Sequence, residues 1–427
     1  MFKKVFYNTA AQTVGKVITA SSTLLITIII GRSLGPTGYG DFTKIFVFVG
    51  YFYTFADFGL NAIYVKNQNT QNDQIKYLFG LRLLIGLLFF ALAVSISALL
   101  PYNEALGTGF SPEVKLGIAI ASITILTQSL FTTTNAYFQK KLRYDLSTIA
   151  AVCSSAVVLI FTLTSSFMHL PLHAYVAAYV FGGIALVSSA YLLIEKIFKT
   201  SLYPSFSKSV FLSFFKKSWP IGTALVFNLI YFRLDVIILS YTRTSQEVGI
   251  YGLAYQFFEA SLSIPIFFAN ALFPLLAALY QKDTHSFQKE VKRWAVLLVA
   301  CSVLLTLALM VASYLIPILF DNRFQKSQLS LTILSLGLPF FFMSALMWHL
   351  VIINNRQKYL MYCYLLGALF NLVLNLIFIP KFGYIAASVI TVLSEALITI
   401  LLFLVIKMHH KSSKADVSNL KLQGAEN

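Results

Sequence analysis

Long apolar stretches, separated by short polar connections, run through almost the whole chain. Most are about 20 to 30 residues long, and about 20 helical residues, rising about 1.5 Å each, cross the roughly 30 Å hydrocarbon core of a bilayer. Hydrophobic residues make up 58% of the sequence and charged residues 11%. A soluble protein with so little charge exposes large apolar patches and aggregates. The pattern therefore predicts a polytopic membrane protein.

The spacing of the stretches predicts an all-α fold with about twelve transmembrane helices. A basic connection near the midpoint separates the first six from the last six. The expected spans are 13–31, 42–64, 78–100, 116–138, 148–167, 173–194, 219–241, 249–280, 294–320, 330–353, 359–379 and 383–406. We expect an N-terminal six-helix bundle over 1–200, a C-terminal six-helix bundle over 201–410 and a cytoplasmic tail over 411–427.

A weak internal repeat indicates that the two bundles are related. GRSLGPTGYGDF at 31–42 and LSYTRTSQEVGIYGLAY at 239–255 each combine a span end, a short turn and the Gly/Tyr-containing start of the next span. Because six is an even number, both bundles enter the membrane in the same orientation. The implied symmetry is a pseudo-two-fold axis along the membrane normal, which places a cavity between the bundles.

The basic residues of the connections predict the orientation of the chain. Most of them fall in one alternating set of connections, which includes the termini, at positions such as Lys3, Lys4, Lys140, Lys141, Arg143, Lys216 and Lys217. The other set contains only Arg32, Lys115, Arg243, Arg323, Lys326 and Lys381. Cytoplasmic connections are enriched in Lys and Arg, so we expect the first set and both termini to be cytoplasmic.

The same distribution accounts for the net charge of +16. Most of the excess faces anionic membrane lipids, so it gives little support for a nucleic-acid partner. Cys153, Cys301 and Cys363 lie inside expected spans, where thiols are usually packing residues. The histidines lack metal-ligand spacing, and no GxxxxGK[ST] phosphate loop occurs, so we expect neither a metal, nor a cofactor, nor ATP hydrolysis.

Ionisable residues inside the spans are the natural functional candidates, because each costs about 2.5 to 3.5 kcal/mol near a helix centre. Arg233 and Asp235 lie deep in the seventh span. They are two positions apart and face different sides of the helix, so each needs a partner elsewhere, a wet cavity or a ligand. Lys16, Lys44 and Arg82 lie near span ends, where long side chains reach the interface.

Several polar residues share helix faces. Asp57 is four positions from Asn61 in the second span, and Glu259 is three from Gln256 in the eighth. Such stripes either line a water-filled path or hydrogen-bond neighbouring helices, and the sequence leaves both readings open. Glu395 in the last span likewise either pairs with another helix or titrates in a proton-coupled cycle.

Four segments resemble the polysaccharide transporter family, the Wzx-type flippases of the multidrug/oligosaccharidyl-lipid/polysaccharide exporter superfamily. They are GRSLGPTGYGDF (31–42), ADFGLNAIYVK (56–66), RLDVIILSYTRTSQEVGIYGLAYQ (233–256) and INNRQKYLMYCYLLGALFNLVLNLIFIPKFGYIAASVITVLSEALI (353–398). Each segment is moderately specific, and their order and spacing strengthen the match. With the twelve-span plan, the resemblance covers the layout of the whole chain.

The resemblance implies a flippase that moves undecaprenyl-pyrophosphate-linked oligosaccharide units across a bacterial cytoplasmic (inner) membrane for O-antigen or capsule synthesis. The implied partners are the lipid-linked oligosaccharide, membrane lipids and polysaccharide polymerase machinery. In the superfamily the passage is lined largely by the first, second, seventh and eighth spans. The expected contacts to the anionic head group on those spans or at their ends are Arg233, Arg32 and Lys44, and the expected coupling or cavity residues are Asp57, Asp235 and Glu259.

The alternatives to a flippase are a drug or cation exporter, an integral membrane enzyme and a membrane scaffold. A drug or cation exporter of the same superfamily would prefer an acidic cavity, which Arg32, Lys44 and Arg233 disfavour. An integral membrane polysaccharide-processing enzyme is expected to carry a large outer loop, and the longest outer connection, 101–115, is short. A membrane scaffold does not explain the deep charges. We therefore expect a transporter and no enzyme.

Overall fold

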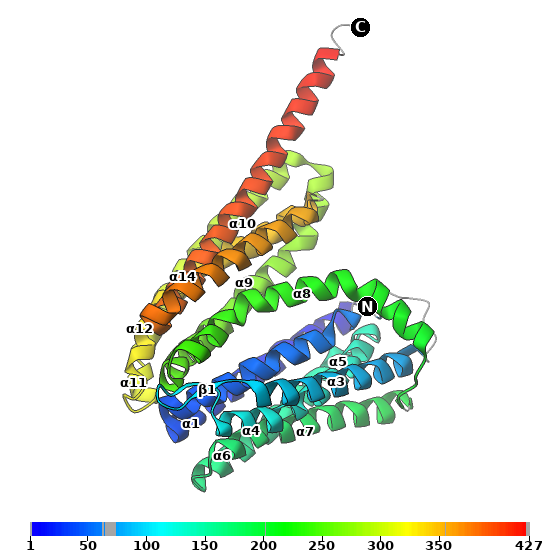
Figure 1. Ribbon diagram of the computed structural model, residues 1–427. Coiled ribbons are helices and arrows are strands. Elements are labelled where there is room, and N and C mark those ends of the chain that lie inside the picture. The colour runs from blue at the N-terminus through cyan, green and yellow to red at the C-terminus, as the bar shows by residue number, and fades with distance from the viewer. Residues whose placement is uncertain (1, 62–63, 65–73, 201, 355, 424–427) are drawn as a thin grey trace. The chain divides into compact units, whose positions relative to one another are not determined.

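The structure is a computed structural model that describes residues 2–61, 64, 74–200, 202–354 and 356–423. Within these ranges it leaves out the side chains of 2–13, 57, 220, 221, 223–231, 281, 284 and 409–423. Almost all of the described chain is helical (Figure 1). The helices are α1 (Phe2–Asp57), α3 (Gln74–Leu99), α4 (Pro112–Ala121), α5 (Ile123–Lys140), α6 (Tyr144–Phe167), α7 (Leu172–Phe198), α8 (Lys208–Thr242), α9 (Ser245–Lys282), α10 (Thr284–Ser313), α11 (Ile316–Leu319), α12 (Gln325–Ser335), α13 (Leu338–Ile353) and α14 (Gln357–Gln423).

Among the described residues, eight helices are long and apolar enough to cross a membrane, or nine if α12 and α13, which meet at 41°, form one broken span. Two of the eight, Val14–Ala56 with 43 residues and Gln357–Met408 with 52, are about twice the length that one crossing needs. Each of the twelve expected spans falls mainly on helical residues. The all-α polytopic membrane fold predicted from the sequence is confirmed.

Glycines divide the two longest helices. In α1 the backbone leaves helical geometry at Gly35 (φ 65°, ψ −177°), and Pro36 follows. In α14 the same happens at Gly383 (φ 60°, ψ −140°), three residues after Pro380. Glycine adopts positive φ without a steric penalty, and in α1 the proline after the glycine starts the next helix well because it has no N–H to satisfy. Each long helix therefore consists of two spans joined by a very tight turn.

The chain forms two compact units. Unit 1 comprises 1–252 and 319–323, and unit 2 comprises 253–318 and 324–427. Unit 1 contains α1, α3 to α8, the first residues of α9 and a short antiparallel hairpin, β1 (Tyr102–Asn103) with β2 (Thr108–Gly109). Unit 2 contains the rest of α9 and α10 to α14. The expected boundary between six-helix bundles near residue 200 stays a prediction.

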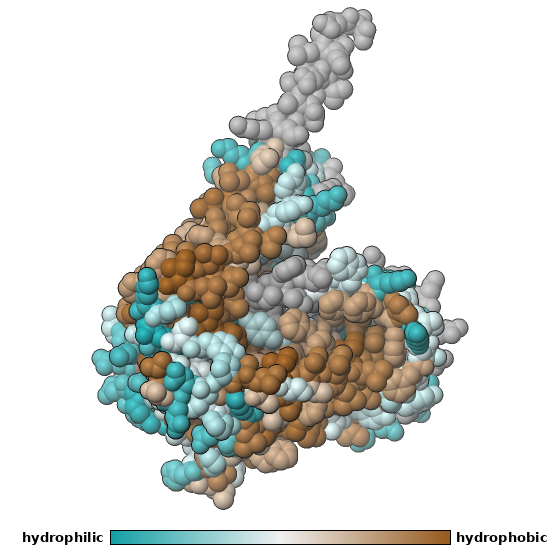
Figure 2. Space-filling view, viewed as in Figure 1, coloured by the Kyte–Doolittle hydropathy of each residue, from teal (hydrophilic) through white to brown (hydrophobic). Residues whose placement is uncertain are grey.

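Hydrophobic side chains cover the outside of the helices. Large exposed apolar residues recur along the flanks, among them Leu88 and Leu92 on α3, Ile160 on α6, and Leu304 and Leu307 on α10. Figure 2 shows hydrophobic residues over the visible helix flanks and hydrophilic residues gathered near helix ends. Because lipid tails are as apolar as leucine, this surface suits a bilayer and is unsuited to water.

Small residues make the closest helix contacts, as is usual in membrane bundles. Gly182 of α7 faces α6 so closely that a methyl group there would lie 2.2 Å from Val158 Cγ2. The Ser154 hydroxyl of α6 donates to the Gly182 carbonyl at 2.8 Å. Close packing and a hydrogen bond, not apolar burial alone, hold these helices together in lipid.

Connections expected on one side of the membrane meet at one end of unit 1, which we call the hairpin end. Thr108 of β2 pairs with Thr244, between α8 and α9. Ser33, beside the bend of α1, is 2.8 Å from Ser166 near the end of α6. Figure 1 shows the hairpin beside this bend.

Connections expected on the other side meet at the opposite end of the same unit. The Ser205 amide donates to the Lys76 carbonyl at 3.1 Å, and the Tyr137 hydroxyl is 3.5 Å from Thr200 Oγ1. The alternation of connections predicted from the sequence is therefore present in unit 1. Which end faces the cytoplasm stays a prediction.

Candidate functional site

Lys44 lies at the centre of a buried polar network at the hairpin end. Its side chain is 1% exposed. Its Nζ donates to the Gly109 carbonyl at 2.7 Å and to Ser245 Oγ at 2.8 Å, and lies 4.0 Å from Asp41 Oδ1. The Ser245 hydroxyl donates to the same Asp41 oxygen at 2.5 Å. Lys44 therefore makes two hydrogen bonds and one longer ion pair, and it joins α1, the hairpin and the start of α9.

Two glycines allow α1 and α9 to approach closely enough for this network. A methyl group on Gly40 would lie 1.7 Å from the Ser245 carbonyl oxygen, and one on Gly249 would lie 2.0 Å from the Pro36 carbonyl oxygen. Backbone therefore packs directly against backbone at both positions. The Gly/Tyr-containing repeats noted in the sequence provide these two contacts, one from each repeat, and pack against each other.

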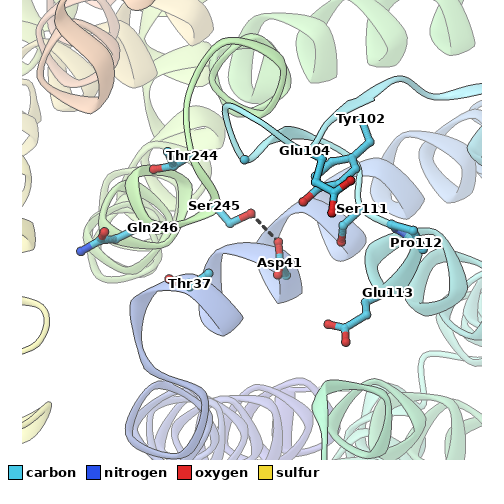
Figure 3. A pocket seen from close by; sticks show the side chains of 11 residues that line it. Thr37, Asp41, Tyr102, Glu104, Ser111, Pro112, Glu113, Thr244, Ser245 and Gln246 are labelled. Carbon is cyan, nitrogen blue, oxygen red and sulfur yellow. Dashed lines mark hydrogen bonds between the residues drawn. The ribbon is translucent and has the colours of Figure 1, made fainter.

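A pocket of about 590 Å³ opens beside the Lys44 network. α1, the hairpin, the start of α4 and the start of α9 contribute its walls. In Figure 3 the carboxylates of Asp41, Glu104 and Glu113 come from three separate segments and surround the same space. The other lining residues are Thr37, Tyr102, Gly107, Ser111, Pro112, Thr244, Ser245 and Gln246. None of the eleven is Lys or Arg, so the pocket is acidic.

Arg233 and Asp235 lie on α8 among tyrosines. Asp235 is 3% exposed and accepts a hydrogen bond from the Tyr251 hydroxyl and one from the Val236 amide at 2.7 Å. Arg233 is half-buried, and both it and Asp235 interact electrostatically with Tyr51 of α1. The deep charges of the seventh span therefore lie against the second span and the beginning of the eighth.

Arg32 takes part in a second, more exposed cluster at the hairpin end. Its Nε donates to the Leu319 carbonyl at 2.5 Å, and its Nη2 lies 3.8 Å from Asp321 Oδ1. Arg323 lies 3.5 Å from the other Asp321 oxygen and donates to the Arg32 carbonyl at 2.5 Å. These contacts hold the segment 319–323 against α1 within unit 1. About half of each of these charged side chains is exposed.

The remaining expected site residues lie elsewhere. Glu259 is half-buried on the part of α9 that belongs to unit 2. The side chain of Asp57 lies outside the described residues. Lys44 and Arg32 share the hairpin end, and Arg233 lies beside Asp235 on α8. The substrate-binding role of Arg233, Arg32 and Lys44, and the coupling role of Asp57, Asp235 and Glu259, stay predictions.

The expectation that Arg82 reaches the membrane interface is wrong. Its side chain is fully buried. The guanidinium donates to Asn61 Oδ1 at 2.8 Å and to the Ala56 carbonyl at 3.4 Å. Because Ala56 is next to the last residue of α1, Arg82 binds a carbonyl that the helix end leaves without an intrahelical donor.

The acidic pocket was not anticipated from the sequence. Asp41 lies in the repeat segment 31–42 and was not singled out, and Glu104 and Glu113 belong to the short connection 101–115. A usable signal was present, because the connection 101–115 carries two carboxylates in an otherwise basic chain. Among the described residues, no group of three or more His, Cys, Asp or Glu side chains is arranged to hold a metal ion.

Comparison with curated protein sequences finds a distant relative. The chain is 26% identical over 217 residues to the "Uncharacterized membrane protein MJ1068" of Methanocaldococcus jannaschii. The match spans 49% of this chain and 42% of the relative, so the chain covers less than half the length of that protein.

Solved structures of transporters share the fold. A lipid II flippase, MurJ, in an inward closed conformation superposes with a TM-score of 0.74 at 16% identity, covering 93% of this chain and 87% of that one. An inward-facing multidrug resistance MATE transporter of the MOP superfamily gives 0.75 at 11% identity, with 95% and 99% covered. A MOP superfamily transporter from Pyrococcus furiosus, described as having a binding pocket of reverse polarity, gives 0.60 at 12% identity, with 97% and 96% covered.

Two family models match the sequence. The one for MatE proteins covers 220–377, in the second half of the chain. The one described as "Polysaccharide biosynthesis protein" covers 2–280, which is well over half of the chain and includes the Lys44 network, the acidic pocket and the Arg233 region. The resemblance noted from the four sequence segments is thus confirmed, and the protein belongs to this polysaccharide biosynthesis family of membrane proteins.

Proposed function

We propose that the protein is a flippase that translocates undecaprenyl-pyrophosphate-linked oligosaccharide units across the bacterial cytoplasmic membrane for synthesis of a surface polysaccharide. The observation that carries this proposal is that a polysaccharide biosynthesis family model covers most of a chain whose described part is almost all membrane-type helix. Its fold is shared with a lipid II flippase.

The physical problem of the proposed substrate explains the placement of charge. Each unpaired hydroxyl taken into hydrocarbon costs several kcal/mol, and an ionised pyrophosphate costs far more. The head group therefore needs cations and hydrogen-bonding groups along its path, while the lipid tail remains in the bilayer. Arg233 is half-buried on a membrane helix and lies near Tyr51, so it supports this role best among the three expected cations.

The three cations have different proposed parts in binding. Arg233 contacts the pyrophosphate within the membrane, and Arg32, about half exposed, contacts anionic groups at the hairpin end. Lys44 is 1% exposed and already donates to Gly109 and Ser245, so it acts on the substrate only when the junction between α1 and α9 changes. Asp57, Asp235 and Glu259 are the proposed cavity or ion-coupling residues.

The proposal is tested by Arg233→Ala in the source organism with the chromosomal gene deleted. We expect loss of surface polysaccharide and accumulation of the lipid-linked repeat unit, at normal protein levels in the membrane, because the half-buried anion-binding group is gone. Arg293→Ala is the matched control, since Arg293 lies on α10 with its side chain 74% exposed. Export at the wild-type level in Arg233→Ala removes this residue from the transport path.

The acidic pocket favours a second candidate function, export of a drug or an organic cation, because carboxylates attract such compounds. A MATE-type transporter shares the fold. This alternative predicts that deletion of the gene sensitises cells to cationic dyes and leaves surface polysaccharide intact. The opposite pattern supports the flippase. Association with a polysaccharide polymerase stays a prediction in either case.

A further inference from the structure

We propose that the acidic pocket at the hairpin end is a binding subsite for neutral or amino sugars of the exported glycan. The inference rests on the proposed function and deepens it, because it names the class of sugar that one part of the protein accepts. Its volume of about 590 Å³ lies within the range of small-molecule sites. Residues from α1, the hairpin, α4 and α9 converge on it, so the helix bundle fixes its shape.

The lining offers the groups that bind sugar hydroxyls. Carboxylates accept hydrogen bonds only, hydroxyls both donate and accept, and the Gln246 amide does each with a different atom. Tyr102 adds a ring with a polar tip, which suits the mixed apolar and polar faces of a sugar. A neighbouring pair of hydroxyls on a sugar ring therefore finds both acceptors and donors within one cavity.

The charges in the pocket select which sugar it accepts. The carboxylates of Asp41 and Glu113 are close enough to interact electrostatically, and like charges repel. A ligand that supplies hydroxyl protons or an ammonium group relieves this repulsion. A uronic acid, a sulfated sugar or a phosphate adds a further negative charge and is excluded. The pocket therefore serves the sugar part of the substrate and not its pyrophosphate.

Position also separates this subsite from the expected cations. Lys44, the nearest, is 1% exposed and turned into the protein, where Asp41, Ser245 and Gly109 surround it. The ammonium is thus not offered to the pocket as an anion-binding group. It offsets part of the Asp41 charge from behind, so most of the charge that a ligand meets comes from Glu104 and Glu113, both exposed.

The test measures binding of free monosaccharides to the full-length protein purified in detergent, by saturation-transfer NMR. The probes are glucose, glucosamine and glucuronic acid. We expect signals from glucose and glucosamine, and a signal at least about tenfold weaker from glucuronic acid, which is the loss caused by about 1.4 kcal/mol of repulsion. Equal binding of glucuronic acid, or binding of none of the three, overturns the proposal.

Two variants locate the binding. Glu113→Gln removes an exposed carboxylate and is expected to weaken glucosamine binding about tenfold. Glu195→Gln, an equally exposed glutamate of α7 outside the pocket, is the control and keeps wild-type binding. A thermal unfolding midpoint unchanged in both variants shows that the fold is intact. Sugar binding that Glu113→Gln leaves unchanged refutes the assignment to this pocket.

The two proposals fail separately. The binding measurement uses purified protein and free sugars, whereas the flippase proposal is tested by polysaccharide export from cells that carry Arg233→Ala. Loss of export together with a pocket that binds no sugar overturns the subsite alone. If ethidium instead of any sugar binds and is lost in Glu113→Gln, the subsite is overturned and the cation exporter gains support.

Discussion

Arg82 shows how a single residue can be misread from the sequence. A long cationic side chain near a span end is expected to reach the interface, because that avoids the cost of burial. The structure buries Arg82 completely, since Asn61 Oδ1 and the Ala56 carbonyl lie within reach of its guanidinium. Acceptors brought from another span decide the outcome, and their position is not encoded in the sequence around Arg82.

Arg82→Met is expected to lower the free energy of unfolding by about 1 to 3 kcal/mol, because a buried acceptor and a partly buried one lose their charged donor. Lys115→Met is the control, since the Lys115 ammonium also donates to a carbonyl, that of Ala98 at 3.2 Å, but in an exposed position. The free energy of unfolding of Lys115→Met is expected to fall by no more than about 0.5 kcal/mol. The measurement is thermal unfolding in detergent. Equal decreases in stability for both variants contradict the interpretation that Arg82 links α1 and α3 through buried hydrogen bonds.

Some of the site residues could be identified from the sequence, and others could not. Arg233 and Asp235 were identifiable from the sequence because a charge inside an apolar span is rare. Asp41, Glu104 and Glu113 were not, because each lies in or beside a connection, where carboxylates are ordinary. They gain meaning only when α1, the hairpin and α4 bring them to one cavity.

At the scale of elements, glycine spacing sets how close α1 and α9 come. Gly249→Ala is expected to destabilise the protein by about 1 to 3 kcal/mol, because the new methyl group meets the Pro36 carbonyl at 2.0 Å and two helices must separate. The same change also opens the Lys44 network, so glucosamine binding at the pocket is expected to weaken with it.

Gly50→Ala provides the matched control for this prediction. Gly50 lies on α1, and a methyl group there has the Tyr53 hydroxyl, at 3.5 Å, as its nearest neighbour, which is an ordinary contact. Alanine also favours a helix over glycine, so this variant is expected to be neutral or slightly more stable. Thermal unfolding of both variants compares them directly. A Gly249→Ala protein as stable as Gly50→Ala speaks against direct backbone packing at this junction.

Helix positions were the most predictable elements. The lengths of apolar runs gave the spans because the bilayer thickness fixes how many residues cross it. The tight turns between consecutive spans were less predictable. At Gly35 in α1 and Gly383 in α14 the chain turns between two spans, and positive φ at a glycine is a local feature that hydropathy does not report.

For the whole molecule, the distribution of lysine and arginine predicts that the hairpin end faces outward and that both termini are cytoplasmic. A cysteine introduced for Ala105, at the hairpin, is expected to react with a membrane-impermeant maleimide in intact cells. A cysteine introduced for Ser207, at the opposite end, is expected to react only after the cells are broken. Native Cys153, Cys301 and Cys363 are first replaced by serine or alanine. Labelling in the reverse pattern inverts the orientation.

The sharing of Ser245 between the pocket and the Lys44 network has a further consequence. Ser245 is a wall of the cavity and also the residue through which α9 is tied to Lys44 and Asp41. Any motion that pulls the beginning of α9 away from α1 dismantles the cavity at the same moment. A sugar bound there stabilises the contact between α1 and α9 until it dissociates. An excess of free glucosamine is therefore expected to slow each transport cycle.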